Sequence, residues 1–178
     1  DVTASKRRRV VESLRNRSLV EHHRHDHWLH PAIRAEAIAR LRASEDLEIA
    51  NRLAAEFWTN SVQTIANVDD ALMAFEAYYH YIEIFDYESA ASVILQRRPT
   101  KRSGVERLGR SFYQLGLLQQ MIDAIAQIMP KIDSGYHLSG LYSILGVLYR
   151  LSGQIHEAID CHQKSGALAA QQLSEIEI

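Results

Sequence analysis

The sequence is poor in the residues that mark several large classes of protein. Its single cysteine excludes an internal disulfide and is typical of a reducing compartment. No apolar run approaches the roughly 18 residues of a membrane-spanning helix, and no apolar segment of the signal-peptide kind follows the basic start. With three prolines and eight glycines in 178 residues, regular structure has few interruptions. We therefore expect a cytoplasmic, mainly helical protein with no membrane partner.

The short motifs of common enzymes are also missing. The sequence has no Gly-x-x-x-x-Gly-Lys phosphate loop, no metal-protease histidine pair and no serine in a nucleophile elbow. Cys161 is adjacent to His162, and on a helix neighbouring side chains point about 100° apart. Glu83, Asp86 and Glu88 are read as helix-end and surface groups. We therefore predict that the chain is not an enzyme and holds no cofactor.

Positive and negative charges are unevenly distributed. Residues 1–42 carry ten Lys and Arg against five acids, a net charge of +5. The remaining residues carry ten against seventeen, a net charge of −7. This asymmetry favours two domains, 1–43 with a basic head and 44–178 with an acidic body.

What the chain does contain is a spacing that occurs twice. In each copy a Leu-Gly pair precedes an aromatic residue, and a second glycine follows. The copies are Leu108-Gly109, Phe112 and Gly116, and Leu145-Gly146, Tyr149 and Gly153. The first glycine lets a neighbouring helix approach, the aromatic residue fills the space beside it, and the second glycine ends the helix in the left-handed conformation. The pattern resembles the tetratricopeptide repeat.

The spacing predicts helical hairpins at about 70–97, 104–129 and 134–173. Their turn markers, Asp86, Gly116 and Gly153, are 30 and 37 residues apart, on either side of the usual period of about 34. Ala91, Ala158 and Cys161 fall where the second helix of a hairpin crosses the first or needs a small buried residue, and Met121 stands where alanine is usual. The predicted fold is mainly α, a tetratricopeptide-like superhelix with a small β-hairpin near the N-terminus.

The N-terminal part changes period. Val10–Leu14 favours a helix, whereas 18–30 alternates and predicts two short strands, the only sheet that we expect. Pro31 then begins a helix, at the position where proline is tolerated best. A further helix is predicted from about Ser44 to Ala66.

This junction is similar to the end of the winged-helix module in STAND signalling ATPases, the group that includes the NB-ARC proteins. Leu14 to Leu19 reads Leu-Arg-Asn-Arg-Ser-Leu, and Leu29-His30-Pro31 follows. The resemblance implies a winged-helix remnant over 1–43 and a repeat array that acts as sensor or partner-binding tail. It also implies that His30 senses nucleotide, but only in a longer parent protein that supplies the NTPase domain. Judged from its neighbours alone, His30 caps the helix that Pro31 begins.

Binding of another protein, or of an NTPase domain of the same parent chain, would use the inner face of the hairpins. The residues expected there are Glu76, His80, Glu83, Arg107, Arg110, Gln114, Ser143, Val147 and Arg150. Arg107 and Arg110 lie one turn apart and can hold a pair of carboxylates, with Tyr113 at the edge. We therefore predict an acidic or mixed-charge protein segment as the partner.

Two alternatives use the N-terminal residues, and a third is a structural oligomerisation module. A DNA-associated regulator would contact phosphates through its basic head. The residues concerned are Lys6, Arg7, Arg8, Arg9, Arg15 and Arg17. A metal site would use His23, His25 and His27, which share one face of an extended strand, although a tight turn would splay them into water.

Overall fold

The computed structural model describes residues 4–17, 19–23, 26–101 and 104–176. The chain divides into two compact units, Asp1–Leu47 and Glu48–Ile178. The predicted division between 43 and 44 lies slightly before the observed one.

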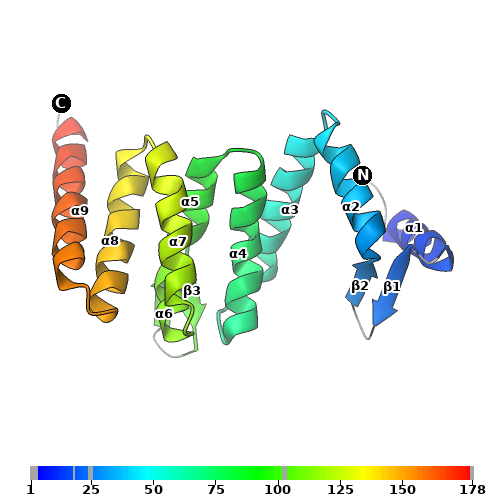
Figure 1. Ribbon diagram of the computed structural model, residues 1–178, viewed down its shortest axis with the longest axis horizontal. Helices are drawn as coiled ribbons and strands as arrows, with labels where there is room; N and C mark the ends of the chain where they lie inside the picture. Colours follow the sequence, from blue (N-terminus) through cyan, green and yellow to red (C-terminus); the bar gives the residue numbers. More distant parts are fainter. Residues whose placement is uncertain (1–3, 18, 24–25, 102–103, 177–178) are drawn as a thin grey trace. The chain divides into compact units, whose positions relative to one another are not determined.

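Within its described residues, the first unit contains two helices and a β-hairpin (Figure 1). Its elements are α1 (Ala4–Asn16), β1 (Val20–His23), β2 (Asp26–Leu29) and α2 (Pro31–Arg42). The strands are antiparallel, with Val20 opposite Leu29. The hairpin predicted over 18–30 is thus confirmed for its described residues, while Ser18 and the turn residues Arg24 and His25 lie outside them.

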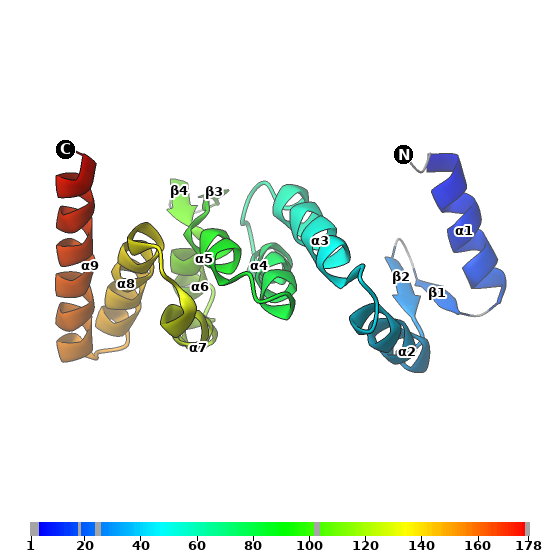
Figure 2. The same ribbon diagram turned by 90° about the horizontal axis from the view of Figure 1, so that it is seen from above.

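The second unit is a row of helices (Figures 1 and 2). Its helices are α3 (Leu47–Ser61), α4 (Val68–Glu83), α5 (Tyr87–Leu95), α6 (Leu108–Gln114), α7 (Leu118–Ile128), the short η1 (Met129–Lys131), α8 (Gly135–Leu151) and α9 (Ile155–Ile176). Every helix from α3 to α9 contributes to one cluster of buried apolar side chains. The described chain is therefore mainly helical, as predicted.

Three helix-to-helix turns of this unit share one backbone geometry. Each contains a residue with positive φ, followed by an N–H that donates to the carbonyl of an aromatic residue in the preceding helix. The bonds are Asp86 N to Tyr81 O at 3.0 Å, Leu117 N to Phe112 O at 2.9 Å, and Gln154 N to Tyr149 O at 2.9 Å. This is the bond of the Schellman motif, which satisfies the carbonyls that a helix end leaves open.

The left-handed conformation predicted for Gly116 and Gly153 is confirmed, with φ of 79° and 84°. In the first turn the left-handed residue is Phe85, with φ of 58°, one position before the predicted turn marker Asp86. Asp86 instead caps α5, where its side chain accepts a hydrogen bond from Ser89 N at 3.0 Å. Asp86 marks the turn in the sequence, but the residue in the left-handed conformation is the neighbouring Phe85.

A second hairpin of strands lies between α5 and α6. β3 (Arg97–Thr100) and β4 (Gly104–Arg107) are antiparallel, so the prediction of a single sheet is wrong. The second helical hairpin accordingly begins at Leu108 rather than at 104. Proline lacks an N–H, so Pro99 predicts the end of regular structure. In the structure it lies in β3, where its carbonyl accepts a hydrogen bond from Ile65 N at 2.9 Å and no N–H is required.

Arg98 attaches this hairpin to the end of α3. Its buried guanidinium donates to Thr59 O at 3.0 Å, to Gln96 Oε1 at 2.8 Å and to Val62 O. Burial lowers the pKa of Arg98. The cation lies where the helix dipole is negative and open carbonyls need donors, which favours the charged form at this buried position.

The two Leu-Gly pairs have different neighbours. A Cβ on Gly109 would lie 2.9 Å from Ile94 Cγ2 of α5 and 3.0 Å from Ile144 Cδ1 of α8, so the predicted close approach is confirmed. A Cβ on Gly146 would instead meet the His162 ring of α9 at 2.6 Å. The positions predicted for small or core residues are buried; they are Ala91, Met121, Ala158 and Cys161.

Candidate functional site

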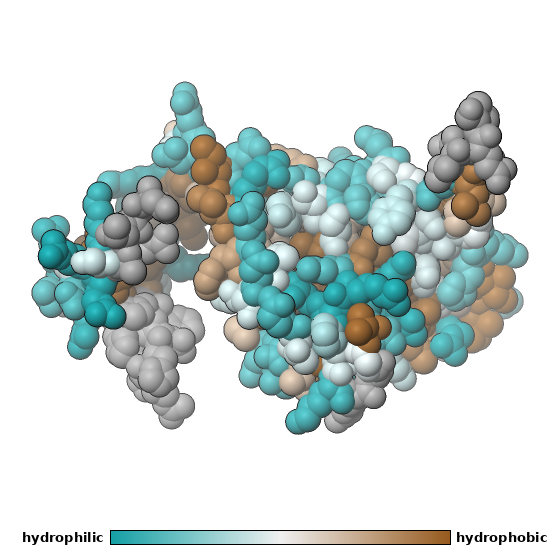
Figure 3. All heavy atoms as spheres, turned by 180° about the vertical axis from the view of Figure 1, so that it is seen from behind, coloured by the Kyte–Doolittle hydropathy of each residue, from teal (hydrophilic) through white to brown (hydrophobic). Residues whose placement is uncertain are grey.

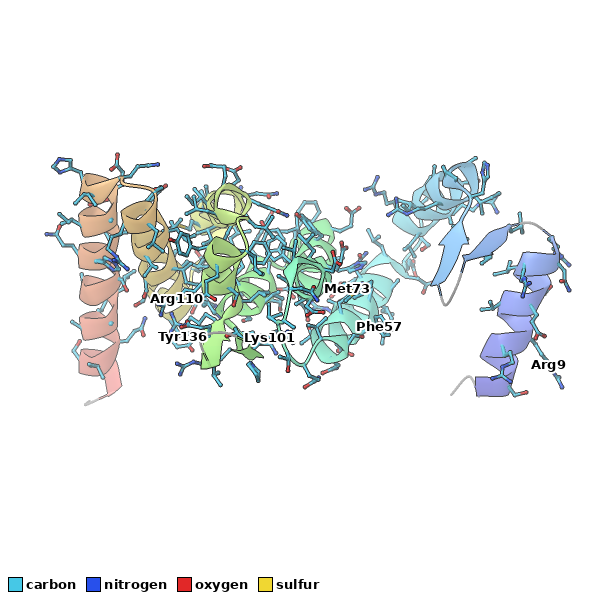
Figure 4. All side chains as sticks on the ribbon, turned by 90° about the horizontal axis from the view of Figure 1, so that it is seen from below. Arg9, Phe57, Met73, Lys101, Arg110 and Tyr136 are labelled. Carbon is cyan, nitrogen blue, oxygen red and sulfur yellow. The ribbon has the colours of Figure 1, made fainter. Side chains whose placement is uncertain are left out.

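Exposed aromatic and cationic side chains lie on α4 and α6 of the second unit. Tyr79 and Arg110 precede the left-handed residues of successive turns by the same number of residues in the sequence. Both side chains are exposed, as is Tyr113. Tyr79 packs edge-on against Phe75 at 5.2 Å between ring centroids. Arg110 forms an ion pair with Glu106 at 3.4 Å, and Figure 4 labels it among the side chains of this unit.

The predicted groove residues do not all point into one space. Glu76, Arg110, Gln114 and Arg150 are exposed, and His80, Glu83, Arg107, Ser143 and Val147 are half-buried. His80 contacts α3, where its Nδ1 lies 2.9 Å from Asn51 Oδ1, and burial lowers its pKa. Two of the four exposed residues, Arg110 and Gln114, lie on α6.

Two cavities flank α6. Arg107 lines one of about 260 Å³ together with Tyr136 of α8 and Gln172 of α9. Gln114 lines another of about 330 Å³ with Lys101, beside the start of α4. The structure therefore places two of the predicted groove residues, Arg107 at the end of β4 and Gln114 at the end of α6, in different cavities.

Apolar side chains are exposed on the outer faces of two helices. On α3 they are Ile49, Leu53 and Phe57, and on α9 they are Ile155, Ile159 and Leu173, each more than half exposed. Residues four apart share a helix face, so these are stripes rather than scattered contacts. Figure 3 shows apolar groups among hydrophilic ones on one face of this unit, and Figure 4 labels Phe57. Sequence periodicity alone predicted both helices but not which side was covered.

A polar cluster that the sequence did not reveal connects α5 to α8. His137 Nδ1 contacts Glu88 Oε2, and His137 Nε2 lies 3.0 Å from Ser92 Oγ. Glu88 Oε1 accepts from Asp133 N and Ser134 N, both at 3.0 Å. Burial alone would raise the pKa of Glu88, but the N–H of Ser134, the His137 ring and the N–H of Asp133 together lower it. Glu88 is therefore more than the surface group expected from its position.

The first unit carries the candidate nucleotide-sensing histidine and the candidate DNA-contacting residues. His30 caps α2, since its Nδ1 accepts from Ala32 N at 3.3 Å, as its neighbours predicted. The described basic side chains are exposed on or directly after α1; they are Lys6, Arg8, Arg9, Arg15 and Arg17, while the side chain of Arg7 lies outside the description. At about 100° per residue, the run at 6–9 is spread around the helix rather than gathered on one face.

The predicted metal ligands fall largely outside the described part of the chain. His25 is not described, and neither are the side chains of His23 and His27. The strand register places His27 opposite His22, on the other strand from His23. Among the side chains that are described, no group of three or more metal-ligating residues forms a site.

Cys161 is buried, and burial raises the pKa of its thiol, which disfavours the reactive thiolate. No helix within the described residues is long and apolar enough to cross a membrane. No protein-family model matches this chain, and neither a curated protein nor a solved structure matches it. The resemblance to STAND proteins therefore rests on sequence motifs.

Proposed function

We propose that the chain is a protein-interaction module whose second unit is a tetratricopeptide-like array. The supporting observation is the turn geometry that recurs at Phe85, Gly116 and Gly153 with the same bond to a preceding aromatic residue. Repeated hairpins place equivalent residues of successive helices in rows, and such rows form extended binding surfaces.

The contact surface that we propose is centred on Tyr79, Arg110 and Tyr113. Tyrosine and arginine supply a large share of the binding energy in many interfaces, because they combine apolar area with a fixed polar group. In the ion pair with Glu106, the Arg110 side chain is 48% exposed and the Glu106 side chain 19%, and pairs that solvent reaches contribute little stability. A carboxylate of the partner can therefore replace Glu106 at low cost. The proposed partner is an acidic or mixed-charge protein segment.

We propose further that the chain is the regulatory part of a STAND-type signalling ATPase that acts in the cytoplasm. The hairpin β1–β2 and the start of α2 at Pro31 support this, because the resemblance requires a wing followed by a helix at these positions. The partner is then either another protein or the NTPase domain of the same parent chain. In that parent, His30 would sense the nucleotide.

A charge-reversal experiment tests the interaction surface. Arg110→Glu and the control Arg40→Glu both break an ion pair of a half-exposed or exposed arginine with a glutamate four residues earlier, at 3.4 Å and 2.6 Å. Both variants should stay folded, because exposed substitutions rarely change stability much. In pull-downs from source lysate, Arg110→Glu should lose the partners that wild type and Arg40→Glu retain. Equal recovery by all three proteins would exclude this surface.

A further inference from the structure

We propose that Glu88, His137 and Ser92 form an acyl-transfer site that cleaves small, uncharged esters. This activity goes beyond the proposed protein binding and contradicts the expectation from the sequence, in which no enzyme motif is present. The spacing gave no signal because the three residues meet only when α5 and α8 pack together.

The order of the three groups is hydroxyl, imidazole and carboxylate. Ser92 Oγ lies 3.0 Å from His137 Nε2, and the other ring nitrogen contacts Glu88 Oε2. This is the connectivity by which serine hydrolases activate a hydroxyl. Glu88 and Ser92 are four residues apart on α5 and share a face, and His137 reaches both from the first turn of α8.

The carboxylate is held in place by the backbone of a second segment. The N–H groups of Asp133 and Ser134 both donate to Glu88 Oε1 at 3.0 Å. These bonds stabilise the ionised form and fix its orientation. An ionised Glu88 favours the imidazole tautomer with hydrogen on Nδ1, which leaves the Nε2 lone pair facing Ser92.

The hydroxyl has two acceptors within reach. Ser92 Oγ also lies 3.1 Å from Glu88 O, the back-bond that serines commonly form within helices. Rotation about the Cβ–Oγ bond redirects the hydrogen from this carbonyl to Nε2 without moving the oxygen. The nucleophile therefore needs no rearrangement of α5 to be activated.

Both reacting side chains line one cavity of about 380 Å³. Its apolar wall comes from Tyr81, Val93, Leu95 and Tyr136, the last of which is labelled in Figure 4. The volume lies at the small end of the range for ligand sites. The described lining residues include no Lys or Arg to select an anion, so the geometry favours a short, uncharged acyl ester.

The start of α8 supplies donors for the developing negative charge. A helix leaves its first N–H groups without intrahelical acceptors. At this end Glu88 takes the N–H of Ser134, and Ser134 Oγ accepts from His137 N at 3.4 Å. We assign stabilisation of the oxyanion to the N–H of Tyr136, which lies in the first turn of α8 and belongs to a residue that lines the cavity.

The reaction proceeds in two steps. In the first, the Ser92 proton moves to His137 Nε2 while Oγ bonds to the ester carbonyl carbon. The carbon–oxygen bond to the alcohol then breaks, and the alcohol oxygen takes the proton from Nε2. In the second step, water gives a proton to Nε2 and bonds to the acyl carbon. The bond from Ser92 Oγ to that carbon breaks, Oγ recovers the proton, and a carboxylic acid is released.

The full 178-residue chain should hydrolyse p-nitrophenyl butyrate and react with a fluorophosphonate probe, with the adduct at Ser92 in peptide mass spectra. Ser92→Ala should abolish the adduct and lower hydrolysis by about 10²-fold or more. Ser61→Ala is the matched control, because Ser61 Oγ makes the same back-bond, to Phe57 O at 2.6 Å. This control should hydrolyse the ester as fast as wild type.

Glu88→Gln tests whether the Glu88 carboxylate orients the His137 ring, because the variant keeps the shape of the side chain and removes the charge. Its hydrolysis should fall while circular dichroism stays that of the wild type. The proposal is overturned if wild type forms no adduct, or if Ser92→Ala hydrolyses the ester at the wild-type rate. The second result would mean that exposed imidazoles cleave the ester without a nucleophilic serine.

Discussion

Gly109 and Gly146 occupy equivalent places in successive hairpins but differ in what surrounds them. The neighbours of Gly109 are branched core side chains from two helices, which have no room to move. The neighbour of Gly146 is an exposed ring that can rotate into solvent. The steric restriction against a larger residue is therefore strict at Gly109 and weaker at Gly146.

We predict opposite responses to alanine at the two sites. Gly109→Ala should lower the free energy of unfolding by about 1–3 kcal/mol, as overpacked core positions do. Gly146→Ala should be neutral or raise it by up to about 1 kcal/mol, because alanine favours a helix more than glycine does. Urea unfolding followed by circular dichroism measures both. Equal losses would show that His162 cannot move aside.

Phe85 provides a second test at a single residue. It is 76% exposed and has a φ of 58°, a conformation that disfavours side chains with a Cβ by roughly 1–2 kcal/mol. Phe85→Gly should raise the melting temperature, with a gain reduced by the larger backbone entropy of glycine in the unfolded chain. Gly116→Ala, at the equivalent turn, should lower it. A lower melting temperature for Phe85→Gly would indicate that the contact with Tyr87, 6.4 Å between ring centroids, contributes more than the strain.

Among the elements, α5 and α8 are joined by Glu88, whose ionised form receives bonds from the start of α8. Its pKa in the folded protein is lowered below the usual 4.5. The folded state therefore binds this proton less readily than the unfolded state, and the stabilisation is fully present above the unfolded pKa. It is lost as the pH falls through the folded pKa, when Glu88 accepts a proton.

We therefore predict that thermal stability falls on acidification below the usual pKa of 4.5, in part because of Glu88. Glu88→Gln should be less stable than wild type at neutral pH and should lose less on acidification. Melting curves across a pH series measure the difference between the two proteins. Parallel curves would assign the acid sensitivity to other carboxylates, such as Asp86, whose pKa is lowered by the Ser89 N–H and by Arg52 in spite of its burial.

For the whole molecule, the position of the core predicts independent folding. The cluster of buried apolar residues extends from Ala55 to Cys161, entirely inside the second unit. A fragment of residues 44–178 should therefore fold alone and melt within a few degrees of the intact chain. Differential scanning calorimetry of the fragment and of the whole protein tests this. A fragment without a cooperative transition would mean that the second unit depends on residues 1–43.

Local signals account for what the sequence predicted correctly. Gly116 and Gly153 predict their turns because the left-handed conformation favours glycine. The alternation over 18–30 predicts a hairpin. The failures involve information that is not local. Pro99 could be assigned to a strand only by knowing that its carbonyl, and not its nitrogen, faces Ile65. The contact of His137 with Glu88 joins two helices, and no spacing in the sequence reports it.

The contact between α5 and α8 also affects how the second unit unfolds. In a linear array each repeat contacts only the next, so opening begins at an end and spreads one repeat at a time. Here the seven-residue α6 lets α5 of the first hairpin meet α8 of the third, with Leu95 against Gly140. Hydrogen exchange of α5 and α8 should therefore require one common opening of high free energy. The last turns of α9 should exchange earlier, by fraying, while the amides of α5 and α8 stay protected.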